Sequence, residues 1–134
     1  MSEALVCDAS ALVAVLATVG ASGSWVARRL VAADLLAPHL ALFETTSALR
    51  RLERTGDLSA DAAAQAHADL VELDLVLWPY EAVARLVWAL RHQVSVYDAA
   101  YVAVAAEADA TLVTLDRRLA GAPGLPCRVA TPPA

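Results

Sequence analysis

Apolar positions along the chain fall into short runs that alternate with longer helical segments. The short runs are mostly apolar and end at Asp, Pro or turn residues, which is typical of strands buried on both faces of a sheet. The expected strands are 4–7, 35–37, 75–78, 111–115 and 128–130. Helical periodicity and helix caps mark the segments between them. The expected helices are 9 to about 19, 25–33 after a turn at 20–24, 39–54, 59 to about 73, 80–92, a central helix that begins near Asp98, and a short one after Asp116.

This alternation of strands and helices predicts a mostly parallel sheet with helices on both faces. The chain has 134 residues, which is the size of one domain with its own core, and no repeat or linker divides it. The apolar fraction is 59%, above the usual share of roughly 45–50%, partly because alanine is abundant. We therefore expect a single α/β domain over residues 1–134.

The uncharged stretch 9–27 has a length that could suggest a membrane segment. Small and polar residues interrupt it between Thr18 and Ser24, and no basic residue precedes it as in a signal peptide. We expect two helices with a turn between them, no membrane association and a cytoplasmic location. The two cysteines, Cys7 and Cys127, are too few for a disulfide scaffold, and Cys7 is expected in the core.

Two aspartates repeat one pattern, in which an apolar strand is followed by Asp and then by a helix. Asp8 follows the first expected strand and Asp116 follows the fourth. Each could simply cap the helix behind it. The carboxyl ends of parallel strands meet at one edge of a sheet, where ligands bind in such folds. The repetition therefore favours a shared site at this edge.

Two further acids stand in apolar surroundings. Asp98 opens the central helix, whose following residues carry no charge until Glu107. Glu44 lies in an otherwise uncharged stretch from His39 to Leu49, although a solvated surface glutamate would also explain it. We expect both side chains to converge on Asp8 and Asp116.

Four carboxylates packed together would repel one another unless cations neutralise them. Mg²⁺ and Mn²⁺ prefer such oxygen ligands, and Mg²⁺ keeps several waters. A site of this kind activates water and stabilises charge on a scissile phosphate. The sequence contains no glycine-rich phosphate loop, no Gly-x-Ser-x-Gly elbow and no His-Glu-x-x-His motif, which disfavours an ATPase, an acyl hydrolase and a zinc protease.

The net charge of -5 argues against nonspecific nucleic-acid binding through a basic surface, although the acids of a metal site contribute to that charge. All ten basic residues are arginine. Arg50, Arg51 and Arg54 gather at the end of one expected helix, where each complements the helix dipole and could also contact phosphate.

Two other classes of aspartate-dependent protein fit poorly. A response-receiver domain uses a lysine, and this chain has none. A haloacid-dehalogenase-type phosphatase has Asp-x-Asp after its first strand, where this chain has Asp8, Ala9 and Ser10.

The chain resembles a PIN-domain ribonuclease, specifically the toxin of a VapBC-type toxin–antitoxin pair. The resemblance covers nearly the whole chain in four segments: VCDASAL at 6–12, PHLALFETTSALRR at 38–51, VYDAAYVA at 96–103 and TLVTLDRRL at 111–119. It implies a three-layer α/β/α sandwich and endonucleolytic cleavage of a cellular RNA, such as tRNA or rRNA. A non-catalytic PIN-like binding module remains the alternative, against which the four intact acids argue.

The resemblance also implies roles for individual residues. Asp8 and Asp98 would be the primary Mg²⁺ ligands, with Mn²⁺ as a possible substitute, and Glu44 and Asp116 would complete the acidic pocket. Ser10 and Thr114 would orient carboxylates or waters around the metal.

Partners follow from the resemblance as well. Members of the family commonly form homodimers and are silenced by a small VapB-type antitoxin, in a toxin–antitoxin hetero-oligomer. The antitoxin's C-terminal segment lies in an apolar groove, for which Trp25, Leu30 and the helix beginning at His39 are the candidates here.

Overall fold

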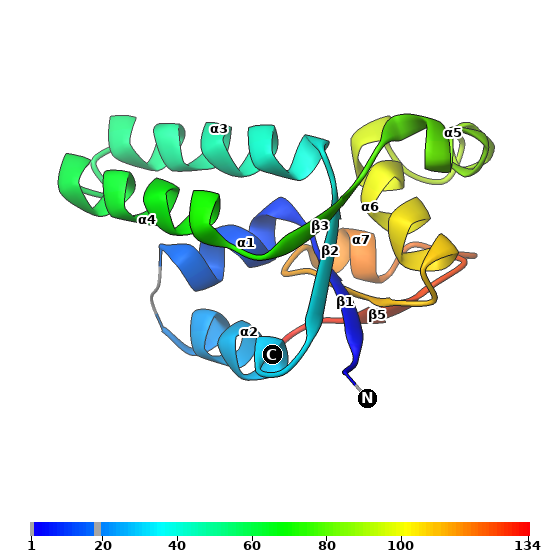
Figure 1. Cartoon of the computed structure of the whole chain (residues 1–134), viewed down its shortest axis with the longest axis horizontal. Helices are drawn as coiled ribbons and strands as arrows, with labels where there is room; N and C mark the ends of the chain where they lie inside the picture. Colours follow the sequence, from blue (N-terminus) through cyan, green and yellow to red (C-terminus); the bar gives the residue numbers. More distant parts are fainter. Residues whose placement is uncertain (1, 18–19) are drawn as a thin grey trace.

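The computed structural model describes residues 2–17 and 20–134 (Figure 1). Within these residues the chain forms five strands and seven helices. The strands are β1 (Ala4–Cys7), β2 (Asp34–Pro38), β3 (Leu75–Trp78), β4 (Thr111–Val113) and β5 (Arg128–Ala130). The helices are α1 (Ala9–Leu16), α2 (Ala21–Leu30), α3 (Leu40–Arg54), α4 (Ala60–Glu72), α5 (Tyr80–Ala89), α6 (Val96–Glu107) and α7 (Arg117–Ala120).

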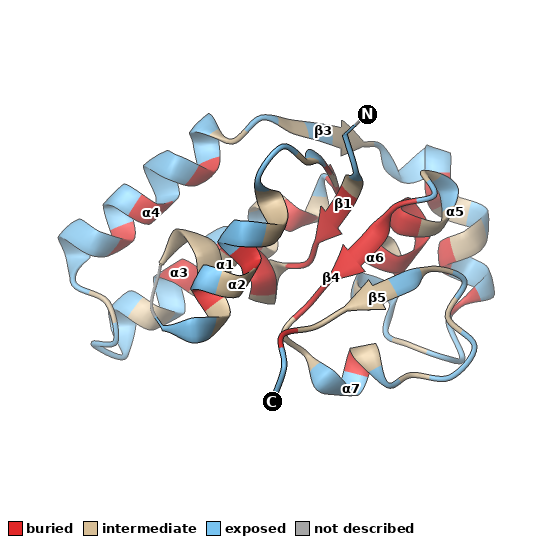
Figure 2. Ribbon diagram, turned by 90° about the horizontal axis from the view of Figure 1, so that it is seen from below, coloured by how far each residue is buried: buried red, intermediate tan, exposed pale blue. Residues whose placement is uncertain are grey.

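All five strands belong to one parallel sheet in the order β3-β2-β1-β4-β5. Helices α1 to α4 lie on one side of the sheet, and α5 and α6 pack together on the other (Figure 2). The expected three-layer α/β/α architecture is therefore confirmed. The order of strands reverses at β1, which has β2 on one side and β4 on the other. In open parallel sheets this reversal leaves a crevice at the carboxyl ends of the two strands.

The core is mainly aliphatic, and α6 lies at its centre. This helix packs on β1, β2 and β4, and its residues from Tyr101 to Ala105 are all buried. Tyr101 has the largest fully buried side chain. Cys7 is a free, buried core residue as expected, and burial, followed by the adjacent Asp8, raises the pKa of its thiol to about 12.

One expected element is wrong at its start. The sequence predicts a turn over 20–24, but α2 begins directly after Gly20, which has a φ of 88° and serves as its N-cap residue. Gly23 is buried inside this helix, so packing outweighs the weak helix propensity of the glycine. The expected end of the preceding helix, at about residue 19, lies outside the described residues.

Among the described residues, no single helix is long and apolar enough to cross a bilayer. Within residues 2–17 and 20–134, α1 and α2 taken together are the one pair that reaches that length, and their axes are 102° apart.

We expect Thr45→Val to stabilise the fold by about 1 kcal/mol. Thr45 is fully buried, and within the described part of the chain its hydroxyl has no hydrogen-bond partner. Valine keeps the shape of the side chain and removes this desolvated group. Urea unfolding would measure the change, with the exposed Thr46→Val as control, expected within about 0.5 kcal/mol of wild type. A clear loss of stability in Thr45→Val would contradict the prediction.

Candidate active site

The acidic site is built around the crevice between β1 and β4. Asp8 follows β1, and its backbone N–H donates to the carbonyl oxygen of Val113, the last residue of β4. Thr114 directly follows that strand and is fully buried. The strand pairing therefore fixes the separation between Asp8 and the residues that follow β4.

The Asp8 carboxylate is only 6% exposed and accepts three hydrogen bonds. Its Oδ1 accepts from the Ser10 hydroxyl at 2.6 Å and from the backbone N–H of Ala11 at 3.0 Å, so Asp8 does cap α1. Its Oδ2 accepts from the Thr114 hydroxyl at 2.5 Å. The capping hydrogen bond involves only Oδ1. Helix capping therefore does not explain the contact between Oδ2 and Thr114.

Burial raises the pKa of Asp8 above its usual range, and the nearby negative charge of Asp98 raises it further. The hydrogen bonds from Ser10 and Thr114 act in the opposite direction without cancelling the effect of burial. The folded structure therefore disfavours the charged form of the Asp8 carboxyl group.

Ser10 and Thr114 also connect the two strand ends to each other. The Ser10 hydroxyl accepts the backbone N–H of Leu115 at 3.0 Å, and the Thr114 hydroxyl accepts that of Asp116 at 3.0 Å. The two hydroxyl oxygens are 3.4 Å apart. Ser10 and Thr114, to which the family resemblance gives the role of orienting carboxylates, are therefore in contact with Asp8 and with the backbone around Asp116.

Asp116 caps α7 by accepting the backbone N–H groups of Arg118 and Leu119. Partial burial alone would raise the pKa of Asp116, but the hydrogen bond from Leu119 and the contacts with Arg118 outweigh it, and the pKa lies below its usual value. The Arg118 guanidinium reaches Asp116 at 3.2 Å and Asp98 at 4.0 Å. It brings these two acids together, although its own side chain is 84% exposed.

Asp98 is the third residue of α6. Ser95 caps this helix by accepting the backbone N–H of Asp98 at 3.1 Å, which leaves the half-buried Asp98 carboxylate free for other contacts. Ser95, and not Asp98, is therefore the N-cap residue of α6.

Glu44 joins the site through a residue that the sequence analysis missed. The buried Tyr101 hydroxyl, one turn after Asp98 on α6, donates to Oε1 of Glu44 at 2.7 Å. Burial and the Glu44 carboxylate raise the pKa of Tyr101 far above its ordinary value, which keeps this hydroxyl a donor. Glu44 is therefore half-buried and held in place, and is not a freely solvated glutamate. The one available signal was a tyrosine three residues after Asp98, in a run that otherwise contains only alanine and valine up to Ala106.

A cavity of about 510 Å³ lies between α1 and α3, and Glu44 is the one of the four acids that lines it. Its lining is mixed and includes both Glu44 and Ser10. The lining residues are Ala9, Ser10, Val13, Glu44, Ser47, Ala48, Arg51 and Leu52.

The donors at the site are carboxylates and hydroxyls, the hard oxygen ligands that suit Mg²⁺ or Mn²⁺. Over residues 2–17 and 20–134, no three His, Cys, Asp or Glu side chains are grouped closely enough to hold one ion among them. This donor set fits an ion that one or two carboxylates bind and that keeps most of its waters, as Mg²⁺ does. It does not fit a closed zinc site.

Trp25 and Leu30 lie on α2, apart from the acids. Both are partly buried and pack on the core, and the Arg29 guanidinium lies over the Trp25 ring at 5.4 Å from its centroid. Their assignment to an antitoxin-binding groove stays a prediction. Helix α3 does border apolar hollows, one of which includes His39 and Leu40.

The chain is similar to proteins of one family along most of its length. The PIN domain family matches residues 5–125, a range that contains all four acids. Ribonuclease VapC1 of Mycobacterium tuberculosis is 41% identical over 130 residues, which cover 96% of this chain and 97% of that protein. Ribonuclease VapC9 of the same organism is 35% identical over 130 residues, covering 96% and 98%. The crystal structure of PAE2754 from Pyrobaculum aerophilum is similar with a TM-score of 0.62 and 30% identity, covering 89% of this chain and 85% of that one.

Asp8→Asn is expected to raise the Tm at neutral pH in EDTA. A carboxyl whose pKa is higher in the folded than in the unfolded state costs stability as the pH rises through its folded-state pKa. Below the ordinary value of 3.8 this cost is absent, because both states are protonated. Asparagine caps a helix as well as aspartate does and carries no charge. The advantage of the variant over wild type should therefore grow from acid to neutral pH.

The control for this measurement is Asp74→Asn, an exposed position outside the site, expected within about 0.5 kcal/mol of wild type. If Asp8→Asn were less stable than wild type at neutral pH, burial of the charge would not dominate the energetics of Asp8.

Proposed function

We propose, since the chain belongs to the PIN-domain family as a VapC-type ribonuclease toxin, that it is a divalent-metal-dependent endoribonuclease acting on a cellular RNA of the tRNA or rRNA class. The observation that carries this proposal is the linkage of four acids from β1, α3, α6 and the end of β4. Hydrogen bonds connect Asp8 through Thr114 to the Asp116 backbone, and Arg118 connects Asp116 to Asp98. Tyr101 connects Glu44 to the same helix as Asp98.

In this proposal Asp8 and Asp98 hold Mg²⁺, or Mn²⁺ in its place, and Glu44 and Asp116 complete the acidic pocket directly or through water. A bound divalent ion would supply an activated water and neutralise the charge that builds up on the scissile phosphate. The raised pKa of Asp8 supports this role, because a cation beside a buried carboxylate removes its electrostatic cost.

The protein's own groups orient the acids before any substrate arrives. The Ser10 and Thr114 hydroxyls each hold one oxygen of Asp8, which fixes the plane of that carboxylate. The Tyr101 hydroxyl holds Glu44, which lines the cavity between α1 and α3. Arg118 balances part of the charge of Asp98 and Asp116, which lets these acids stand close together.

The proposal includes a small VapB-type antitoxin as partner, with Trp25 and Leu30 in its binding surface. It also includes a homodimer and a bacterial cytoplasmic location. Partial burial of Trp25 on α2 is compatible with an antitoxin that covers the remaining face of the ring.

Asp8→Asn and Asp98→Asn are each expected to reduce RNA cleavage at least about 100-fold, because loss of a metal ligand should cost no less than loss of a supporting hydrogen bond. Purified protein freed of antitoxin would be incubated with total bacterial RNA in Mg²⁺ or EDTA. Discrete fragments that require both Mg²⁺ and Asp98 support the proposal. Asp74→Asn is the control that should cleave as wild type does.

Cleavage by Asp98→Asn at the native rate would overturn the assignment of the site. If calorimetry detects no Mg²⁺ binding and the wild-type protein does not cleave RNA, these results would instead favour the non-catalytic binding module.

Ser95→Ala and Ser59→Ala form a matched pair, because each serine caps one helix with one backbone hydrogen bond. Each substitution is expected to cost about 1 kcal/mol of stability. Only Ser95 holds the backbone of a proposed metal ligand, so Ser95→Ala should also lower cleavage about tenfold. Urea unfolding and initial cleavage rates would separate the two effects. Equal cleavage rates in the two variants would mean that the cap does not position Asp98.

A further inference from the structure

A second cavity continues from the first along α3. It has a volume of about 380 Å³ and is lined by Ser47, Arg50, Arg51, Arg54 and Thr55. Ser47 and Arg51 also line the cavity that holds Glu44. The two hollows therefore adjoin along one helix, with Glu44 in the lining at one end and arginines at the other.

The spacing of these residues explains the continuity. Residues three or four apart lie on the same face of a helix. Glu44, Ser47, Arg51 and Arg54 follow this spacing from the second turn of α3 to its last residue. With a rise of about 1.5 Å per residue, Arg51 lies about 10 Å from Glu44 along the helix axis.

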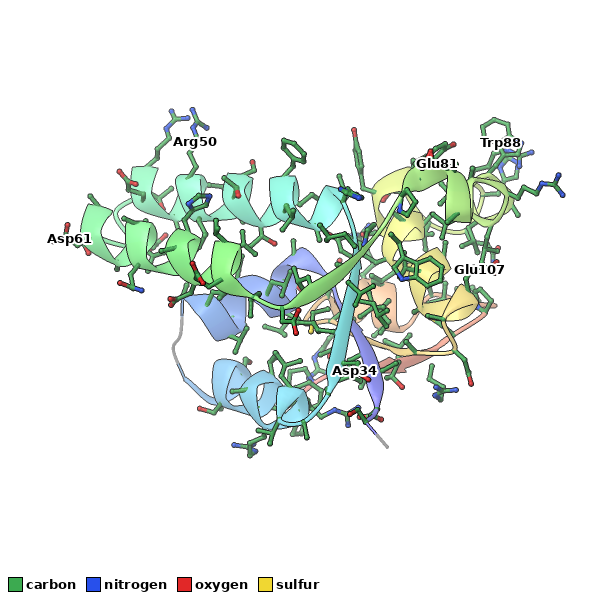
Figure 3. The ribbon with its side chains drawn as sticks, viewed as in Figure 1. Asp34, Arg50, Asp61, Glu81, Trp88 and Glu107 are labelled. Carbon is green, nitrogen blue, oxygen red and sulfur yellow. The ribbon has the colours of Figure 1, made fainter. Side chains whose placement is uncertain are left out.

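Arg50, Arg51 and Arg54, here called the arginine cluster, concentrate positive charge on a protein whose net charge is -5. All three side chains are exposed, and over residues 2–17 and 20–134 none of them forms an ion pair with Asp or Glu. Figure 3 shows the Arg50 side chain pointing away from the sheet. Glu44 is the only acid in the described lining of the two cavities.

We propose that the arginine cluster binds the phosphate backbone of the RNA strand whose scissile bond lies at the acidic site. This inference rests on the proposed function. A guanidinium offers several donors in a planar fork that matches phosphate, and phosphate contacts fix the register of a bound strand without reading its sequence. The cluster compensates locally for the repulsion between an acidic protein and a polyanion. A strand lying along α3 would then enter the cavity from the arginine end.

Complementing the helix dipole is a sufficient role for a basic residue in the last turn of a helix. It does not account for Arg51 lining both cavities, nor for Arg50 and Arg51 lying together on the hollow that continues from Glu44. Dipole complementation would also affect stability alone, whereas a phosphate contact affects the salt dependence of RNA binding. The two roles can therefore be separated by measurement.

The test measures binding of fluorescein-labelled single-stranded RNA of mixed sequence by fluorescence anisotropy. The full chain carries Asp98→Asn to prevent cleavage, and salt is varied between about 50 and 200 mM. Adding R50A, R51A and R54A together is expected to weaken binding about 10- to 100-fold, the sum of three modest charge contacts. The slope of log affinity against log salt should fall by about 0.7 for each phosphate that the variant no longer binds.

A matched control removes three other exposed arginines, R28A, R85A and R91A, and so changes the net charge equally. Arg28 lies on α2, and Arg91 stacks on Trp88, which lies at the opposite end of the molecule from Arg50 in Figure 3. The control triple should keep most of the affinity and of the salt slope. Arg51→Lys should retain most of the salt slope, because it keeps the charge and loses only the planar fork.

Unchanged affinity and slope in the R50A, R51A and R54A variant would overturn this inference, as would an equal loss in the control triple. If the triple variant lost antitoxin binding and kept its RNA affinity, the inference would also be overturned, and the arginine cluster would be a binding site for the antitoxin. If wild-type protein still cleaves RNA in these cases, the proposed function stands without the inference. Failure of the Asp98→Asn protein to bind RNA at all, with no cleavage by wild type, would overturn both.

Discussion

The hydrogen bond from Thr114 to Asp8 is the interaction on which the site depends. A carboxylate buried to this extent is costly unless donors satisfy it. The Thr114 hydroxyl supplies one donor and in turn accepts the backbone N–H of Asp116. One hydroxyl thus joins the ends of two parallel strands at the crevice where the strand order reverses. The other acids are arranged around this junction by their own helices.

Much of the fold could be predicted from the sequence, because buried parallel strands leave a clear pattern. The bounds expected for three strands, 4–7, 75–78 and 128–130, agree with β1, β3 and β5. An apolar run that ends at polar, proline or turn residues can be recognised as a strand from the sequence alone. Helix α2 shows the limit, since Ser22, Gly23 and Ser24 have the composition of a turn and become helical through packing.

Some residues of the candidate site could likewise be placed from the sequence, and others could not. Asp8 and Asp116 could be placed together because strand ends in a parallel sheet share an edge, and the structure joins them through Thr114. The contact between Tyr101 and Glu44 spans 57 positions in the sequence and connects two helices on opposite sides of the sheet. No spacing rule predicts such a pair. Arg118 was equally invisible, because its position between two acids depends on how α7 packs.

The connection between Asp8 and Thr114 has a consequence for how the protein is made. The two partners are 106 positions apart, so the ribosome adds Asp8 long before it adds Thr114. Strand β4 separates β1 from β5 and completes the centre of the sheet. Until β4 leaves the ribosome, Asp8 has only the donors that lie next to it in the sequence, the Ser10 hydroxyl and the Ala11 backbone N–H. A nascent chain whose β4 has not yet joined the sheet therefore lacks the hydroxyl that connects Asp8 to Asp116, so the complete acidic site forms late in folding.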